Sequence, residues 1–399
     1  MIVIIADDLT GAMDTGIQFT KKGLSTSVLI RCDQLESFDK SSCAALAVNT
    51  DSREADGERA AAITEGLVKA LRLGPEDLIY KKVDSLMRGN PVEELDAALA
   101  ASGRSCALAA TSFPATGRFV RGGILHMPGG AKKDLRQMFE ASRYPVDFLR
   151  VNELEEKLPL LRSALEEGPR IFFCDAESDE DLARIGVCGE KLGNVVYCGS
   201  AGLANQLIQG RQAQTPERPQ SSRILVVTGT RKQETAEQVR VLVETGEFKT
   251  VVANVEALSD PSLCEAEAVE RAAEADALFA AGKQVILAMN SLFESQTGYG
   301  NESVADRQKG VELARQLAGI LHRIDKDRYD GLVIIGGDTS RAACAMFGAT
   351  TISLHSEIES GTAYGLICDG EIKGMPIVTK SGAFGTPQTL KVAVDYMRA

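Results

Sequence analysis

The sequence predicts an α/β protein with two domains, each built on a largely parallel sheet, and with an interdomain cleft. Short apolar runs alternate with longer amphipathic segments, which is typical of strands and helices in this fold class. A polar stretch with two prolines interrupts the alternation near the middle of the 399 residues, and this length suits two domains. We therefore expect domains at residues 1–212 and 223–399, joined by a linker at 213–222.

The first half contains a series of short apolar runs separated by helical patterns. The expected strands are residues 2–6, 27–30, 44–48, 78–80, 106–110, 171–174 and 195–198. A helix is expected over 53–71, where apolar residues recur at three- and four-residue spacing. Another is expected to begin at Asn90-Pro91, because Asn suits a helix cap and Pro the first helical position.

The second half repeats this pattern after the polar stretch "GRQAQTPERPQSSR" at 210–223. The expected strands are residues 224–228, 250–253, 284–288 and 332–335. A hairpin is expected around Asp369-Gly370, and a final helix is expected to follow Pro387.

Composition argues against two classes of partner. The chain has 44 Lys and Arg against 56 Asp and Glu, no Trp, and no run of basic residues, so we expect no nucleic-acid binding. No apolar run approaches the ~18 residues that span a bilayer, and the first residues lack a signal-peptide pattern, so we expect no membrane association.

Cysteine and histidine usage points to a cytoplasmic protein without a structural zinc site. The nine cysteines form no CxxC pair and lie mostly in apolar stretches, as reduced thiols do. The three histidines are far apart and show no HExxH spacing. The sequence identifies no metal ligands, so these remain unknown.

Two adjacent carboxylates, Asp7 and Asp8, follow the first apolar run. Ligands of open α/β sheets bind beyond the carboxyl ends of strands, so this pair is expected at a site. One carboxylate could cap the next helix while the other meets a cation or a sugar hydroxyl. The alternative is that both only cap a helix at residues 10–22.

The segment "KKVDSLMRGN" at 81–90 also follows an expected strand. Its cations suit a carboxylate, and Asp84 and Ser85 suit hydroxyl groups, so the segment is appropriate for an acidic polyol. Arg53 ends another expected strand region and could add to the same site. The alternative is a solvated loop with surface charges.

Three glycine-containing loops follow strands or precede helices in the second half: "VVTGTRKQET", "VIIGGDTSRAA" and "TKSGAFG". Glycine at a helix N-terminus lets backbone N–H groups approach phosphate oxygens. Each loop alone is also a common strand-to-helix connection. Since no GxGxxG follows a strand, a dinucleotide site has little support.

Taken in order, "ADDLTGAMDTG", "KKVDSLMRGN", "GSAGLA", "GGDTS" and "KSGAFG" resemble the four-carbon acid sugar kinases, a family first described as a domain of unknown function. The resemblance covers essentially the whole chain. It implies an N-terminal acid-sugar-binding domain and a C-terminal nucleotide-binding domain. It also implies ATP-dependent phosphorylation of the terminal hydroxyl of threonate, erythronate or 3-oxo-tetronate in carbohydrate catabolism, with ATP and Mg²⁺ as cofactors.

The resemblance also assigns residues to the two sites. Those expected to line the acid-sugar site are Asp7, Asp8, Arg53, Lys82, Val83, Asp84, Ser85, Arg88 and Asn90. Those expected to bind nucleotide are Thr230, Gly337, Asp338, Thr339, Ser340 and Gly382. Leu86-Met87 and Ala383 differ from the residues more usual in the family, which could alter the acid that fits.

Phosphoryl transfer needs positioning and charge neutralisation more than covalent chemistry. Asp8 and Asp84 are both candidates for the group that accepts or orients the proton of the terminal hydroxyl. A non-catalytic sensor of acid sugar and nucleotide is the alternative function. The sequence leaves open the stereoisomer and the oligomeric state, for which a homodimer is expected only from general frequency.

Overall fold

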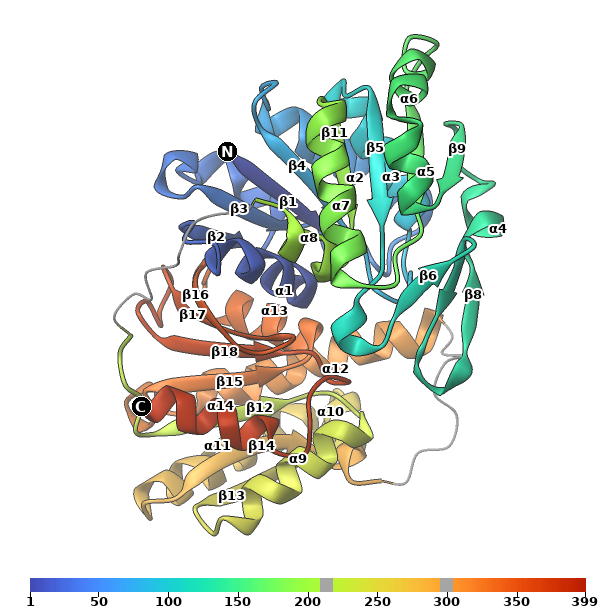
Figure 1. Ribbon diagram of the computed structural model, residues 1–399. Coiled ribbons are helices and arrows are strands. Elements are labelled where there is room, and N and C mark those ends of the chain that lie inside the picture. The colour runs from blue at the N-terminus through green and yellow to red at the C-terminus, as the bar shows by residue number, and fades with distance from the viewer. Residues whose placement is uncertain (209–217, 295–303) are drawn as a thin grey trace. The chain divides into compact units, whose positions relative to one another are not determined.

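The computed structural model describes residues 1–208, 218–294 and 304–399, and it divides into two compact units, Met1–Gln214 and Thr215–Ala399 (Figure 1). Both units are α/β, which confirms the expected fold class. The expected linker at 213–222 lies partly outside the described residues, and the domain limits stay a prediction.

The first unit contains a parallel sheet with the strand order β2-β3-β1-β4-β11-β5-β10-β9. Its strands are β1 (Ile2–Ala6), β2 (Thr26–Leu29), β3 (Ala45–Asn49), β4 (Leu78–Lys82), β5 (Cys106–Ala110), β9 (Val146–Leu149), β10 (Arg170–Cys174) and β11 (Val195–Gly199). Strands β1, β3, β5 and β11 are buried along their whole length, as expected for parallel strands covered by helices. Of these eight strands, β9 was not predicted.

Helices cover this sheet and connect its strands. They are α1 (Leu9–Thr20), α2 (Gly57–Leu71), α3 (Pro91–Ser102), α4 (Leu135–Phe139), α5 (Val151–Glu156), α6 (Leu158–Ala164), α7 (Asp179–Leu192) and α8 (Ala201–Gln206). One apolar core joins side chains from the central strands with those of α2 and α3.

A small antiparallel sheet also belongs to this unit, formed by β6 (Phe119–Arg121), β7 (Ile124–His126) and β8 (Lys132–Asp134). It was not predicted, because strands of three residues with charged side chains carry no clear apolar alternation.

The second unit contains a sheet with the order β13-β14-β12-β15-β18-β17-β16. Its strands are β12 (Ile224–Thr228), β13 (Phe248–Ala253), β14 (Gln284–Met289), β15 (Gly331–Ile335), β16 (Thr351–Glu359), β17 (Thr362–Ile367) and β18 (Pro376–Lys380). Strands β12 to β15 and β18 are parallel, whereas β17 is antiparallel to both neighbours. The hairpin expected around Asp369-Gly370 is β17–β18, and β16 was not predicted.

The helices of the second unit are α9 (Gln233–Glu244), α10 (Val255–Ser259), α11 (Cys264–Ala280), α12 (Val304–Arg323), α13 (Gly337–Met346) and α14 (Thr389–Arg398). Its core joins apolar side chains of the central strands with those of α9 and α14.

Two helix starts differ from the predictions for local reasons. Helix α2 begins at Gly57 and not at 53, because the Asp56 side chain accepts a hydrogen bond from the Arg59 N–H and caps the helix there. Asn90 precedes α3 but does not cap it. Its side-chain amide instead donates to the carbonyl oxygens of Ser52 and Ala55.

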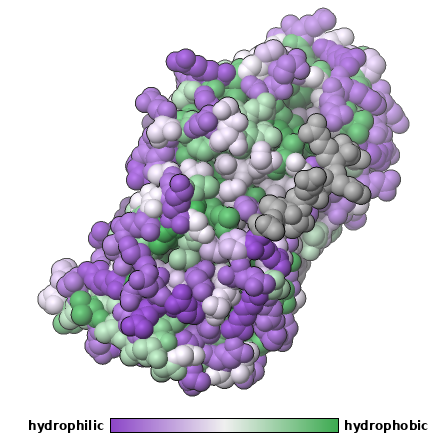
Figure 2. Space-filling model, turned by 90° about the vertical axis from the view of Figure 1, so that its left-hand side faces the viewer, coloured by the Kyte–Doolittle hydropathy of each residue, from purple (hydrophilic) through white to green (hydrophobic). Residues whose placement is uncertain are grey.

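The face shown in Figure 2 is mostly hydrophilic, with apolar residues in smaller patches. Among the described residues, the large apolar side chains that are exposed come from separate elements: Leu160, Val187, Val252, Leu263, Val269, Phe293 and Val392. A search of the described helices for a long apolar segment that could cross a bilayer finds none.

Candidate active site

The ends of three neighbouring strands bring the polar residues of the first unit together. Strand β1 lies between β3 and β4, and Ala6 at its end is in register with Asn49 and Lys82. The residues that follow these strands therefore share one edge of the sheet. This edge receives Asp7 and Asp8, the segment that contains Arg53, and the loop at residues 83–90.

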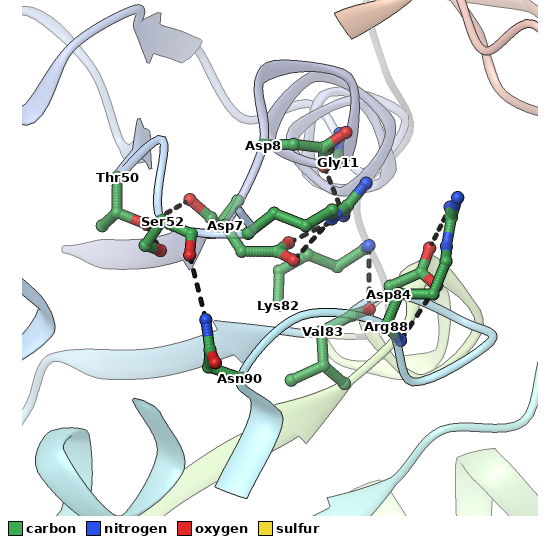
Figure 3. A network of polar contacts seen from close by, with 12 residues as sticks. Asp7, Asp8, Gly11, Thr50, Ser52, Lys82, Val83, Asp84, Arg88 and Asn90 are labelled. Carbon is green, nitrogen blue, oxygen red and sulfur yellow. Dashed lines mark hydrogen bonds and ion pairs between the residues drawn. The ribbon is translucent and has the colours of Figure 1, made fainter. Parts of the chain in front are cut away.

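Arg53 holds both carboxylates of the adjacent pair. Its Nε donates to Asp7 Oδ2 at 2.7 Å, and its Nη2 donates to Asp7 Oδ1 at 2.9 Å and to Asp8 Oδ1 at 2.8 Å. Figure 3 shows the carboxylates among the other charged side chains of this edge. One guanidinium thus neutralises much of the repulsion that two adjacent carboxylates would otherwise experience.

The two carboxylates differ in exposure and in their remaining contacts. The Asp7 side chain is 2% exposed, whereas that of Asp8 is 22% exposed. Asp8 Oδ1 also accepts a hydrogen bond from the Gly11 N–H at 2.9 Å and so caps α1. Asp8 Oδ2 has no hydrogen-bond partner among the described residues, so it is available to a ligand.

Burial and charge act in opposite directions on Asp7. Burial alone would raise the pKa of this carboxyl, but the charge and hydrogen bonds of Arg53, with smaller contributions from Lys81 and Lys82, hold the pKa below its usual value. Asp7 is therefore an ionised carboxylate that holds the Arg53 side chain in place.

Lys82 points to the first turn of α1. A Cβ at Gly11 would lie 3.1 Å from Lys82 Nζ, which shows how closely the ammonium approaches this turn. The ammonium donates to the Val83 carbonyl oxygen at 2.9 Å (Figure 3). Val83 therefore contributes its backbone carbonyl oxygen to this region, because its side chain is buried in the core.

Asp84 and Arg88 form a bidentate pair across one turn of the loop. Arg88 Nε donates to Asp84 Oδ2 at 2.7 Å, and Nη2 donates to Oδ1 at 2.8 Å. The N–H groups of Leu86 and Arg88 also donate to Oδ2, at 3.1 and 3.3 Å. Burial would raise the pKa of Asp84, but these hydrogen bonds and the charges of Arg53, Arg88 and Lys82 hold it far below its usual range.

The loop needs glycine at position 89. Gly89 has a φ of +79°, and a Cβ there would lie 3.3 Å from both Asp7 Oδ2 and Arg53 Cγ. Met87 also has a positive φ, of 56°, although its side chain is buried. The loop at residues 83–90 therefore packs closely on the Asp7–Arg53 pair at Gly89.

A buried ion pair behind the site was not predicted. Lys81 Nζ lies 2.9 Å from Glu94 Oε2, and the two side chains are 0% and 1% exposed. Glu94 also accepts a hydrogen bond from Ser52, whose hydroxyl lies 2.7 Å from that of Thr50. This network fixes the segment before Arg53 to α3. Two consecutive lysines at a strand end were the only signal that one of them needed a buried partner.

Two cations from outside the expected motifs also reach the loop. Arg118 Nη1 donates to Ser85 Oγ, and Lys133 Nζ donates to the Met87 carbonyl oxygen at 2.6 Å. Arg118 directly precedes β6, in the segment "FPATGRFVRGG" at 113–123, whose sequence indicates only a loop, and Lys133 lies in β8, outside the motifs of the sequence.

In the second unit, the three glycine-containing loops follow three neighbouring strands, β12, β15 and β18. Their adjacency comes from the strand order and not from the order in the chain. The carboxyl ends of parallel strands lie at one edge, so the loops meet there.

Close backbone contacts join these loops. A Cβ at Gly382 would lie 2.4 Å from Thr230 Oγ1, and a Cβ at Gly229 would lie 2.4 Å from Thr339 Oγ1. The Thr235 hydroxyl also donates to the Gly382 carbonyl oxygen at 2.8 Å. The structure thus brings Thr230, Thr339 and Gly382 together, as expected for residues of one site.

Helix α13 begins at Gly337 without a side-chain cap. Its first N–H groups point out of the helix, and with the helix dipole they form an environment suited to phosphate. Asp338 is exposed, whereas Thr339 and Ser340 are buried, and the Ser340 hydroxyl donates to the Gly336 carbonyl oxygen at 2.9 Å.

Lys380 lies within the third loop, "TKSGAFG", but is not among the residues expected to bind nucleotide. Its ammonium is buried and donates to the carbonyl oxygens of Ser381 and Phe384, both at 2.7 Å. Burial lowers the pKa of Lys380 to about 8, although the charges of Glu234 and Glu359 oppose this. The contacts show that Lys380 shapes the loop that contains Gly382.

Within the described residues, no group of three or more His, Cys, Asp or Glu side chains is arranged to hold a metal ion.

Family models match almost the whole chain. A sugar-binding N-terminal domain matches residues 2–137 and 126–207, and a nucleotide-binding C-terminal domain matches residues 225–390. The two matches fall on the two units that contain the charged strand edge and the glycine loops, respectively.

Curated relatives match over their full length. A D-threonate kinase of Bordetella bronchiseptica is 32% identical, covering 100% of this chain and 97% of the relative. A D-threonate kinase of Salmonella typhimurium is 30% identical (99% and 98%), and a D-erythronate kinase of Heliobacterium modesticaldum is 26% identical (99% and 97%).

Solved structures share the fold. A Salmonella typhimurium protein described as a putative tRNA synthase has a TM-score of 0.76 at 20% identity, covering 100% of this chain and 99% of that one. A Haemophilus influenzae protein of a domain family of unknown function has a TM-score of 0.69 at 18% identity, covering 100% of both chains. At these identities the likeness concerns the fold alone. On its domain matches and its curated relatives, this chain belongs to the four-carbon acid sugar kinase family.

Proposed function

We propose that this protein is an ATP-dependent kinase that phosphorylates the terminal hydroxyl of a four-carbon acid sugar of the threonate, erythronate or 3-oxo-tetronate type. The observation that carries the proposal is the division of chemistry between the units. One unit gathers carboxylates and cations at a strand edge, and the other gathers three glycine loops at the ends of neighbouring strands. Curated relatives that match this chain over nearly its full length are named as kinases of such acids.

The charged edge of the first unit suits an acidic polyol. Carboxylate oxygens accept hydrogen bonds from sugar hydroxyls, and nearby cations attract the carboxylate of the acid. Asp7, Arg53 and Asn90 serve mainly as the framework, because their side chains are occupied by one another and by the backbone. Asp8 and Lys82 are therefore the side chains that we expect to contact the substrate.

Asp8 is the group that we assign to the terminal hydroxyl. Its Oδ2 is available, and its partial exposure allows a ligand to reach it. Asp84 accepts four hydrogen bonds and its pKa is held far below the usual range, so it is a weak base. We therefore assign to Asp84 the positioning of the loop and not the proton transfer.

The second unit would bind ATP through Thr230, Gly337, Asp338, Thr339, Ser340 and Gly382. The uncapped start of α13 and the close approach of the loops at Gly382 fit the phosphates. Mg²⁺ would be held chiefly by the phosphates and would neutralise charge during transfer, as in other kinases.

In the proposed step, the hydroxyl oxygen attacks the γ-phosphorus, the bond from this phosphorus to the bridging oxygen of ADP breaks, and the hydroxyl proton passes to Asp8. The products are ADP and a phosphate monoester of the acid. A cytoplasmic location and a homodimer stay predictions.

A panel of four-carbon acids tests the proposal. The purified protein with ATP and Mg²⁺ should release ADP with at least one acid, and ³¹P NMR should show a phosphate monoester on the terminal carbon. The Asp8→Asn variant should lose turnover by about 10²- to 10⁴-fold, whereas the exposed control Asp33→Asn should not. Binding of both ligands without ADP release would instead identify a sensor.

A further inference from the structure

The small sheet β6–β8 has two different faces. In the register of its strands, Val120, Leu125 and Lys133 lie side by side on one face. Directly paired residues of neighbouring strands lie on the same face, and Val120 and Leu125 are fully buried in the core of the unit. Lys133 is therefore a charged residue on the inward face, whereas its neighbour Lys132 is exposed on the other face.

Lys133 reaches from this inward face to the loop that follows β4. Its ammonium donates to the Met87 carbonyl oxygen at 2.6 Å, between Asp84 and Arg88 in the chain. Burial lowers the pKa of Lys133, with Asp84 acting in the opposite direction. The ammonium is thus partly desolvated within the electrostatic range of the acid-sugar site.

Arg118 approaches the same loop from the start of β6. It donates to the hydroxyl of Ser85, and its backbone pairs with Phe113. Burial lowers the pKa of Arg118, and Asp84 again opposes this effect. The two cations therefore lie around one loop, although fifteen positions separate them in the sequence.

The charges of the site show which cations are available to an anion. Arg53 is paired with Asp7 and Asp8, and Arg88 is paired with Asp84. Lys133 forms no ion pair with a carboxylate of the described residues, and its one hydrogen bond there uses one of its three protons. A half-buried ammonium with an uncharged partner is stabilised when an anionic ligand binds beside it.

Resting on the proposed function, we propose that Lys133, together with Arg118, binds the carboxylate of the acid substrate and selects acids over neutral polyols. Of the cations in the sequence motifs, Arg53 is engaged by two carboxylates of the protein itself, and Lys82 donates to the Val83 carbonyl oxygen beside the first turn of α1. The small sheet thus supplies the specificity of the site. The competing explanation is that Lys133 only protects the edge strand β8 from pairing with another chain.

Steady-state kinetics with matched substrates tests this. The Lys133→Met variant should raise KM for the acid by about 10- to 100-fold with KM for ATP unchanged, and Lys133→Arg should restore most of the affinity. With threitol or erythritol, which lack the carboxylate, wild type and Lys133→Met should be alike. The control Lys132→Met should resemble wild type throughout.

If Lys133→Met raised KM equally for the acid and for the neutral polyol, the inference would be overturned. An unchanged KM for the acid in Lys133→Met would overturn it as well. Calorimetric binding of the acid without ATP separates this inference from the proposed function. If wild type releases no ADP but Lys133→Met weakens acid binding and Lys132→Met does not, the inference stands and the kinase assignment fails. Far-UV circular dichroism and the melting temperature of Lys133→Met must match wild type, and a collapse of both would assign Lys133 to the fold.

Discussion

Replacing Arg53 with Met should destabilise the first unit in a way that depends on pH. Arg53 makes three hydrogen bonds to two carboxylates, one of which, Asp7, is almost fully buried. The variant leaves adjacent negative charges without their shared partner. Breaking a buried pair by removing one member costs about 3–5 kcal/mol, and we expect a loss of this size at pH 7.

The sign of the pH effect follows from the pKa of Asp7. In the wild type this pKa is lowered, so the ionised carboxylate contributes stability above its unfolded value of 3.8, and the contribution is lost as pH falls through the folded pKa. In Arg53→Met, burial remains while the main opposing charge is gone. The pKa of Asp7 should then rise above its unfolded value. Protonation of Asp7 at low pH should therefore reduce the loss of stability in the variant.

Urea unfolding at pH 7 and pH 4.5 measures both effects. Because the chain has no Trp, far-UV circular dichroism is combined with hydrogen exchange of peptides from β1, which reports on the unit that contains Arg53. With an m-value of about 2–3 kcal/mol/M, the urea midpoint of the variant at pH 7 should lie about 1–2.5 M below that of wild type. The difference in unfolding free energy between variant and wild type should be smaller at pH 4.5.

Arg59→Met is the matched control, because Arg59 lies exposed on α2 and its side chain forms no hydrogen bond or ion pair with the described residues. It should unfold within about 0.5 kcal/mol of wild type at both pH values. A gap for Arg53→Met that is equally wide at pH 7 and pH 4.5, or no larger than that of Arg59→Met, would refute the assignment of Arg53 as the buried partner of Asp7.

Three further predictions concern the two sites. Gly382→Ala would place a Cβ 2.4 Å from Thr230 Oγ1, so the loops must separate, and KM for ATP should rise at least about 10-fold while acid binding measured by calorimetry stays unchanged. Asp84→Asn should lower kcat for the acid at least about 10-fold with KM for ATP unchanged, because the bidentate pair with Arg88 is lost; an equal loss of ATP affinity would count against this role. Burial lowers the pKa of Lys380 to about 8, so its positive charge is lost as pH rises through this value. KM for ATP should therefore rise above pH 8 in wild type but stay level in Lys380→Met. The same dependence of KM on pH in both proteins would contradict this role of Lys380.

The sequence predicts the buried parallel strands well for a physical reason. A strand covered by helices on both faces is a continuous apolar run, as β1, β3 and β5 are, and polar residues mark its end. The expected edge with Asp7 and Asp8 follows from this. The small sheet β6–β8 could not be predicted, since its strands have three residues each and only the middle residue of each strand lies on the inward face.

Pairing between distant residues is the part that sequence patterns do not contain. Arg53 and Asp7 are 46 positions apart, and they meet because β1 and β3 are neighbours in the sheet. The inward direction of Lys133 likewise depends on the register with Leu125, because a shift of one residue would expose it. The glycine loops of the second unit were identified one by one, but their contact at Gly382 depends on a strand order that differs from the chain order.

The adjacent carboxylates that end β1 have separate tasks because their surroundings differ. Asp7 is buried and both of its oxygens accept hydrogen bonds from Arg53, so it remains ionised and holds that side chain in place. Asp8 shares the same guanidinium through one oxygen only, and its other oxygen is available. A substrate hydroxyl needs an acceptor that is ionised, fixed in position and not yet saturated. Of the two, only Asp8 meets the last condition, and it does so because Arg53 and the first turn of α1 bind its other oxygen and leave Oδ2 available.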